Sequence, residues 1–363
     1  MKKYHLATLL AILLSLTACA GSSNIPEKTQ YQAKKLAYNS TEVIPQEVLE
    51  KQLITKLRYP IRGALNTDYF FTNYVDHDVR EGLFQDSNCG AKTYDGHEGT
   101  DFAISNFSAM DQGVEVLAAA DGVVYQTHDG EFDRQKEAKS RTTKANYVNI
   151  RHANGLTTSY YHLKKNSISV KVGDEVKAGD VLGLVGSSGF SSGPHLHFAA
   201  YFKGKLIDPF AGACNPNPSF WETKSKYETN FRVWASGISS DPALTNDQVK
   251  ESPAHELVIA SSEKRVNFWV HFLNAPANLD FSFRFIRPDG DEYTTYNGHS
   301  DKFKSDGWLW AYTPVANSKM TKYSGLWRVE FIHKGKVLAS SAFTLGFSPE
   351  SRLNSLLKCE WSK

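Results

Sequence analysis

Cysteine is scarce in this chain of 363 residues, and none of its four cysteines stands in a Cys-x-x-Cys pair. A zinc site built from paired cysteines is therefore not expected. An excess of charge is also missing, because 41 basic and 39 acidic residues leave a formal net charge of only +2. This balance does not favour nucleic-acid binding, which needs a basic surface, although a local basic patch would be compatible with it.

The apolar run near the N-terminus is too short to span a bilayer comfortably, since a spanning helix needs about twenty apolar residues. This run, LATLLAILLSLTA, follows a short basic start and ends just before Cys19. Residues 1–18 are therefore predicted to be a signal peptide. Leu16-Thr17-Ala18-Cys19 resembles the bacterial lipobox, which implies that a lipoprotein carries its lipid on Cys19. A plain signal peptide with a chance cysteine is the alternative.

A lipid on Cys19 would anchor the protein to a membrane, since each buried methylene contributes about 0.8 kcal/mol. Ala20 and Gly21 follow the cysteine. By resemblance to Gram-negative lipoproteins, the lack of aspartate there implies the outer membrane, facing the periplasm. Residues 19–50 are polar and lack a sustained apolar period, so they are predicted to be a tether.

Short β-prone runs separated by glycine turns dominate residues 51–222. Asp121-Gly122 and Asn154-Gly155 stand between such runs, and these dipeptides are the strongest hairpin signals in a sequence. The stretch is predicted to be a mainly β domain with antiparallel strands and little helix. The charged segment EFDRQKEAKSRTTK, residues 131–144, has no apolar face and is predicted to be a solvated loop. A place at the rim of a substrate site is the alternative for this segment.

A second β pattern covers residues 230–347. Apolar residues alternate with polar or long ones in two of its segments: Phe281, Phe283 and Phe285, and Trp327, Val329 and Phe331. Such period-two strands with closely spaced turns predict a C-terminal β-sandwich of Ig-like architecture. Residues 348–363 are predicted to be a short terminal tail.

Histidines and an aspartate at short spacings are the strongest chemical signal in the chain. Zinc binds imidazole nitrogen and carboxylate oxygen, usually in a tetrahedral set. His195 and His197 are two apart, so they would point the same way from a strand. His97 and Asp101 are four apart and can share a face, while the two glycines beside them argue against a helix. The helical zinc motif His-Glu-x-x-His is not matched, because Asp101 stands where its second histidine would be.

The chain contains three motifs in the order GHEGTDF, YYHL and SSGFSSGPHLHF, with glycine-rich, β-prone sequence between them. Together they resemble the signatures of LytM/lysostaphin-type zinc metallopeptidases. Each motif alone is weak, but their order makes the resemblance specific. It runs from about residue 66 to residue 210, near two-fifths of the chain. The resemblance implies an antiparallel β metallopeptidase domain of the duplicated-hybrid-motif type.

By that resemblance, His97, Asp101 and His197 bind one zinc ion, and His162 and His195 form the catalytic pair. A histidine that does not bind metal can take a proton from water, and another can stabilise the oxyanion or protonate the leaving amine. We favour His195 as the base, because the interval of two holds it beside His197. The opposite division of roles stays open.

Other residues are weaker candidates for the site. Tyr94 and Tyr160 could donate a hydrogen bond to an oxyanion, but packing is the favoured interpretation. The sequence Gly189-Phe-Ser-Ser-Gly193 matches the hydrolase elbow Gly-x-Ser-x-Gly, yet a strand rather than a helix is expected after it.

His152 is interpreted as a turn residue. Core packing is favoured over a sugar or peptide platform for a group of aromatic residues: Trp308, Trp310, Tyr312 and Trp327.

Three cysteines remain once Cys19 is assigned to the lipid, and Cys89, Cys214 and Cys359 allow three pairings. Cys89 lies just ahead of the His97 motif, and Cys214 follows the predicted strand of His197. A disulfide between Cys89 and Cys214 would tie the two edges of one domain together in an oxidising compartment. The other two pairings stay open.

Together these features predict a zinc endopeptidase that cuts the peptide cross-links of peptidoglycan at the cell envelope. In a Gram-negative wall the scissile bond would join D-alanine to meso-diaminopimelate. The expected partners are peptidoglycan stem peptides, a membrane through the lipid, and an envelope protein through the C-terminal domain. Two alternatives are a non-enzymatic lipoprotein that binds the wall or activates another hydrolase, and a zinc protease that acts on envelope or secreted proteins. Loss of the metal site is not supported, because all five site residues are present.

Overall fold

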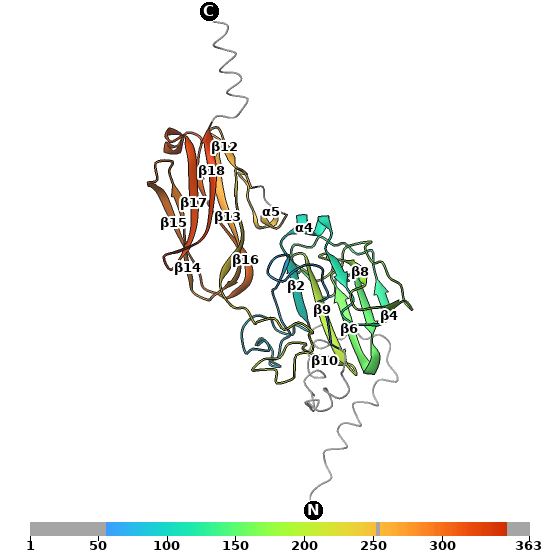
Figure 1. The fold of residues 1–363 in the computed structure, drawn as a ribbon. Helices are drawn as coiled ribbons and strands as arrows, with labels where there is room; N and C mark the ends of the chain where they lie inside the picture. Colours follow the sequence, from blue (N-terminus) through green and yellow to red (C-terminus); the bar gives the residue numbers. More distant parts are fainter. Residues whose placement is uncertain (1–55, 252–254, 347–363) are drawn as a thin grey trace, which may run out of the picture. The chain divides into compact units, whose positions relative to one another are not determined.

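A computed structural model describes residues 56–251 and 255–346 (Figure 1). The predicted signal peptide, tether and terminal tail lie outside the described residues, as do Cys19 and Cys359. Among the residues that the structure describes, no helix has the length and apolar character needed to cross a membrane.

One antiparallel sheet of eight strands carries Asp101, His195 and His197 (Figure 1). Its strand order is β1-β2-β9-β6-β5-β4-β7, and β10 pairs with β9 beside this path. The strands are β1 (Tyr69–Phe71), β2 (Thr100–Ile104), β4 (Gly122–His128), β5 (Tyr147–Arg151), β6 (Leu156–Tyr161), β7 (Glu175–Val176), β9 (His195–Phe202) and β10 (Lys205–Ile207). A separate two-stranded sheet pairs β3 (Glu115–Leu117) with β8 (Val181–Leu184), and the short helix α4 (Phe107–Gln112) follows β2. The expectation of a mainly β chain is confirmed.

Alternate residues of β9 face the apolar core and the candidate site. Leu196 and Phe198 are fully buried in the apolar core, whereas His195, His197 and Tyr201 are only partly buried. Successive side chains of a strand point to opposite faces of the sheet. The histidines therefore share the face of the sheet that is turned away from this core.

The two predicted hairpin signals have different outcomes. Asn154 and Gly155 adopt positive φ angles of 61° and 82° in the tight turn between β5 and β6, as expected. The hairpin expected at Asp121-Gly122 is wrong, because β3 pairs with β8 and β4 pairs with β5 and β7. Glycine is needed at 122 for a close approach instead: a Cβ there would lie 2.6 Å from Ile150 Cγ2 and 2.7 Å from the carbonyl oxygen of Arg151.

The C-terminal strands form two further sheets that share one core. The first sheet has the order β11-β13-β16 and the second has the order β12-β18-β17-β14-β15. Their bounds are β11 (Arg232–Ser239), β12 (Val258–Ala260), β13 (Arg265–Ala275), β14 (Leu279–Ile286), β15 (Glu292–Ser300), β16 (Lys304–Pro314), β17 (Gly325–His333) and β18 (Lys336–Gly346); the helix α5 (Asn246–Glu251) follows β11. Phe268 of the first sheet packs in one buried cluster with Phe283, Phe331 and Trp327 of the second. This is the β-sandwich that the alternating pattern predicted, and Trp327 belongs to its core.

A disulfide joins Cys89, in the long segment ahead of β2, to Cys214, which follows β10. The two cysteines are 125 residues apart in the sequence. The bond therefore ties together the two chain segments that flank the strands of the candidate site.

Candidate metal centre

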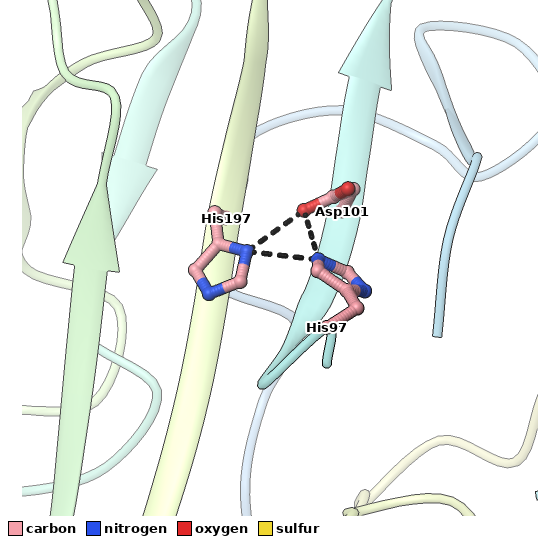
Figure 2. A group of neighbouring side chains, drawn as sticks. All are labelled: His97, Asp101 and His197. Carbon is pink, nitrogen blue, oxygen red and sulfur yellow. Dashed lines mark hydrogen bonds and ion pairs between the residues drawn. The ribbon is translucent and has the colours of Figure 1, made fainter. Parts of the chain in front are cut away.

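Strand pairing places two of the three proposed ligands next to each other. Asp101 of β2 lies directly opposite His197 of β9 in the antiparallel register. His97 lies in the turn that leads into β2, and its ring lies next to the side chain of Asp101 (Figure 2). Two ligand positions thus come from the backbone ladder of the sheet, and the third comes from a turn.

Three side-chain atoms converge on one point in this group (Figure 2). Asp101 Oδ1 lies 3.1 Å from His97 Nε2 and 2.9 Å from His197 Nδ1. The two nitrogens are 3.1 Å apart. Zinc binds histidine nitrogen and carboxylate oxygen at about 2.0–2.2 Å, and one ion can reach three atoms at these separations.

Neighbouring groups fix the orientation of two of these ligands. His97 Nδ1 donates a hydrogen bond of 2.7 Å to the carbonyl oxygen of Tyr74. Asn73 Nδ2 donates one of 2.9 Å to Asp101 Oδ2. Nε2 of His97 and Oδ1 of Asp101 are thereby left to face the point of convergence. Partners of this kind set the tautomer of a ligating histidine and hold a ligating carboxylate in place.

The donor atoms of His97, Asp101 and His197 are arranged to bind a cation between them. With its Nδ1 proton committed to Tyr74, a neutral His97 ring turns an unprotonated Nε2 toward the oxygen of Asp101. A second proton or a metal ion relieves this contact between two acceptors. Burial alone would lower the pKa of His97, but the Asp101 carboxylate outweighs it, so the pKa is raised. Burial would raise the pKa of Asp101, but the neighbouring histidines hold that pKa well below its usual value.

Glycine at position 99 gives the turn room to approach the ring of His197. A Cβ at Gly99 would lie 2.6 Å from the carbonyl oxygen of Phe198 and 2.7 Å from His197 Nε2. Contacts under 3.0 Å require something to shift. The spacing of the GHEGTDF motif therefore depends on a residue without a side chain at this position.

His162 and His195 lie together beside the proposed ligands. Their ring centroids are 4.6 Å apart, and the ring of His162 is 5.8 Å from that of His197. His195 Nε2 is 3.6 Å from Asp101 Oδ1. All five residues singled out from the sequence are therefore brought to one place.

Carbonyl oxygens hold both of these rings in the same tautomer. His162 Nδ1 donates a hydrogen bond of 2.6 Å to Ser188 O, and His195 Nδ1 donates one of 2.8 Å to Gly193 O. Each neutral ring thus keeps Nε2 as its proton-accepting atom. Burial, together with the neighbouring histidines His195 and His197, lowers the pKa of His162 well below its usual value. His162 also has a φ of 66°, an uncommon conformation for a residue other than glycine and one that clusters at functional sites.

The two tyrosines considered as oxyanion donors lie in different places, one beside the site and one in the core. The ring of Tyr94 lies 4.5 Å from that of His97, so this tyrosine borders the site. Tyr160 is fully buried, and its hydroxyl oxygen accepts hydrogen bonds from the Ala119 amide and from Thr158 Oγ1. Tyr160 is therefore a packing residue, as favoured.

Two further motifs also have structural roles. His152 is buried, with Nδ1 donating to the carbonyl oxygen of Asp121 at 2.8 Å and Nε2 lying 2.7 Å from Thr158 Oγ1. Ser191 lies in the loop that leads into β9, where its hydroxyl donates to Gly193 O. A strand, not a helix, follows the Gly-x-Ser-x-Gly match, as the sequence predicts.

The structure places three side chains that the sequence analysis missed in a row with two of the proposed ligands. Residues directly opposite one another on the adjacent strands β2, β9, β6, β5 and β4 form this cross-strand row: Asp101, His197, Tyr161, Tyr147 and His128. Successive ring centroids from His197 to His128 are 6.2, 5.0 and 5.8 Å apart. The metal centre thus stands at one end of a row of aromatic side chains.

Comparison with known proteins finds similarity around the candidate site. Residues 95–209 match the family model described as Peptidase family M23, and all five site residues lie within this range. The chain is 39% identical over 113 residues to an uncharacterized metalloprotease of Buchnera aphidicola, a match that covers 31% of this chain and 25% of the relative. It is 37% identical over 112 residues to the peptidoglycan DD-endopeptidase ShyA of Vibrio cholerae, covering 31% of this chain and 22% of the relative.

Among solved structures, a zinc-containing peptidase from Vibrio cholerae is 28% identical, with a TM-score of 0.29, and the match covers 42% of this chain and 39% of the other. The chain spans about a quarter or less of the length of the two curated relatives above.

Proposed function

We propose that this protein is a zinc-dependent endopeptidase that hydrolyses peptide cross-links of peptidoglycan, because residues 95–209 match the model of Peptidase family M23. One observation carries the proposal: the donor atoms of His97, Asp101 and His197 converge beside the paired rings of His162 and His195. A relative named as a peptidoglycan DD-endopeptidase supports the choice of substrate.

The proposed zinc ligands are His97 Nε2, Asp101 Oδ1 and His197 Nδ1. Zinc held by three protein ligands supplies Lewis acidity toward a carbonyl and lowers the pKa of water toward neutrality. The protein contributes the orientation of this set. Asn73 and the carbonyl of Tyr74 hold two of the ligands in place, and the buried surroundings strengthen every charge interaction there.

His195 is the proposed base, because its Nδ1 proton is bound to Gly193 O and its Nε2 is left to accept the proton of the attacking water. His162 has the same arrangement with Ser188 O. We assign it to the developing negative charge and the leaving amine, where a proton held at Nε2 stabilises the products. Both roles require the Nε2 atoms to face the reacting groups, unprotonated in His195 and carrying a proton in His162.

The proposed setting is the cell envelope, with the protein held at the outer membrane by a lipid on Cys19. A tethered enzyme reaches only what lies within the length of its linker, which favours the wall over soluble substrates. The proposal also divides the chain into a catalytic domain at residues 51–222 and a sandwich domain at residues 230–347 that meets an envelope partner.

Mass spectrometry of muropeptides tests the proposal directly. Purified protein loaded with zinc is incubated with Gram-negative sacculi, and released peptides are compared with and without a chelator. Cross-linked dimers are expected to decline and new amines to appear, both abolished by the chelator and by His195→Ala. Equal release by wild-type and His195→Ala protein would contradict the assignment. Cleavage of unfolded protein substrates but not of sacculi would replace the proposed substrate.

A further inference from the structure

His162 leaves β6 in a conformation that must be held by its surroundings. It follows directly after Tyr161, the last residue of the strand, and has a φ of 66°. Residues other than glycine rarely adopt this conformation, and it persists only where the surrounding structure fixes it. The ring of His162 donates its hydrogen bond to the carbonyl oxygen of Ser188, 26 residues further along the chain. The position of His162 therefore depends on what fixes Ser188 against the end of β6.

Ser188 contacts both the ring of His162 and the residue that follows it. Ser188 is fully buried. Its Oγ donates a hydrogen bond of 2.9 Å to the carbonyl oxygen of Leu163 and accepts one of 3.0 Å from the amide of Asn146. Its carbonyl oxygen holds the ring of His162 at 2.6 Å. One residue thus fixes His162 through its ring and through its neighbour in the chain.

Asn146 is the second buried residue of this network. Its Nδ2 donates hydrogen bonds to the carbonyl oxygens of Leu163, at 3.0 Å, and of Glu131, at 3.1 Å. Its Oδ1 accepts one of 2.8 Å from the amide of Glu131, and its own carbonyl oxygen accepts one of 3.1 Å from the amide of Leu163. Both polar atoms of this fully buried side chain are thereby engaged.

The charged segment at residues 131–144 borders the site, and Asn146 closes its base. Arg141 and Lys144 of the segment line a cavity of about 520 Å³ together with His162, in keeping with the alternative of a substrate rim. Asn146 follows the end of the segment and binds its first residue. The same side chain therefore fixes this segment and the end of β6 relative to each other.

Two glycines allow the loop that contains Ser188 to lie close to its partners. A Cβ at Gly186 would lie 2.5 Å from the amide nitrogen of Lys164, and one at Gly189 would lie 2.6 Å from Cβ of Ala145. The loop thus packs directly against the chain that follows β6 and against the chain that precedes β5. Close packing on two sides leaves the carbonyl oxygen of Ser188 little room to move.

We propose that Asn146 and Ser188 are positioning residues for the reaction, which act through His162 and keep its Nε2 directed at the reacting groups. The inference rests on the proposed function and adds two residues to it. A buried polar network commonly serves to fix the fold. This network also meets at the carbonyl oxygen of Leu163 and at the carbonyl that selects the tautomer of His162. A displacement of that second carbonyl changes where the ring points.

Turnover of a cross-linked muropeptide dimer by the zinc-loaded, full-length protein tests the proposal. Ser188→Ala removes both hydrogen bonds of Oγ but keeps the carbonyl that accepts from His162. We expect kcat to fall by about 10-fold to 100-fold, as for a catalytic group that is displaced, with KM and zinc content unchanged. Asn146→Ala is expected to lower kcat at least as much. Ser188→Ala alone decides the question if this second variant does not fold.

Ser167→Ala is the matched control. The hydroxyl of Ser167 likewise donates to a carbonyl oxygen, that of Lys164 at 2.7 Å, and accepts from an amide, that of Leu184 at 3.0 Å. Neither contact involves His162, so this variant is expected to keep the wild-type kcat. A wild-type kcat in Ser188→Ala, or equal losses in the two serine variants, would overturn the positioning role.

Nitrogen NMR of the histidine rings separates failure of this inference from failure of the proposed function. In the wild type, the neutral ring of His162 is expected to hold its proton at Nδ1, and His162→Gln identifies its signal. A mixture of both tautomers in Ser188→Ala supports the positioning role, whereas a wild-type signal refutes it. This measurement needs no turnover, so it decides the inference even if the wild-type protein cleaves no muropeptide and the proposed function fails.

Discussion

Asp101 and His197 are directly paired across β2 and β9, with 2.9 Å between Oδ1 of the first and Nδ1 of the second. The antiparallel ladder holds their backbones at a separation that no side-chain rearrangement can alter. His97 depends on a turn instead, and so the packing of that turn is the most vulnerable part of the centre.

Gly99→Ala is expected to disturb this turn. The added Cβ would meet Phe198 O and the ring of His197 at under 3.0 Å, so the ring must move. We expect a lower zinc content after dialysis and a loss of about 1–3 kcal/mol in the free energy of unfolding, typical of overpacking. Gly193→Ala is the control, because a Cβ there has no neighbour within 4 Å. Wild-type zinc content in Gly99→Ala would contradict the close approach.

Asn73→Ala is expected to weaken metal binding without removing a ligand. The amide of Asn73 holds Oδ2 of Asp101, and loss of such a supporting hydrogen bond typically costs 10-fold to 100-fold in metal affinity. Competition with a chromophoric zinc chelator measures the effect. The exposed residue Asn297 gives a control variant, Asn297→Ala, which should bind zinc like the wild type. Equal affinity in the two variants would show that Asn73 does not orient Asp101.

Replacing both cysteines of the disulfide is expected to destabilise the fold. The bond between Cys89 and Cys214 closes a long loop, and loss of such a bond typically costs about 2–4 kcal/mol, in part by freeing the unfolded chain. Denaturant unfolding of a Cys89→Ser, Cys214→Ser double variant measures the loss. A reductant should destabilise the wild type to the same extent and leave the double variant unchanged. A reductant effect on the double variant would point to another disulfide.

Buried His152 is expected to make stability depend on pH. Burial lowers its pKa in the folded state, so the contribution is fully present above about pH 6.5, the ordinary value for histidine. Below that pH the unfolded chain takes up the proton first, and the free energy of unfolding falls by at most about 1.4 kcal/mol per pH unit. Unfolding curves between pH 7.5 and pH 5 should show a shallower decline in His152→Gln.

His299→Gln provides the contrast for the His152 experiment. This exposed histidine is paired with Asp280 and Asp301, which raise its pKa. A raised pKa stabilises the fold at low pH, and that contribution is lost as the pH rises. His299→Gln should therefore retain the acid decline that His152→Gln reduces. An identical pH profile for His152→Gln and wild type would show that the ring of His152 can be protonated in the fold.

Local patterns in the sequence predicted the structure correctly where the contacts that determine it are local. The interval between His195 and His197 places both on one strand face, and Asn154-Gly155 marks a true hairpin. Long-range contacts were not accessible in this way. The sequence at Asp121-Gly122 looks like a hairpin because it has the right residues, yet the glycine there serves packing against Ile150.

The aromatic row illustrates the same limit within the site. His128, Tyr147 and Tyr161 belong to different strands and share no motif, so only the register of the sheet reveals that they stand in line with His197. Asn73 was missed for a similar reason, because it lies 28 residues before Asp101 outside any recognisable signal. Both depend on tertiary packing that composition and spacing do not encode.

The cross-strand row also determines which changes in length the chain can accept. Deleting one residue inside β6 would reverse the faces of the side chains beyond it, which would turn Tyr161 away from the row. The segment at residues 141–145 lies outside the paired strands, so its length can vary without shifting the row or the ligands. Insertions and deletions in related chains should therefore gather in this segment, while the metal centre stays intact.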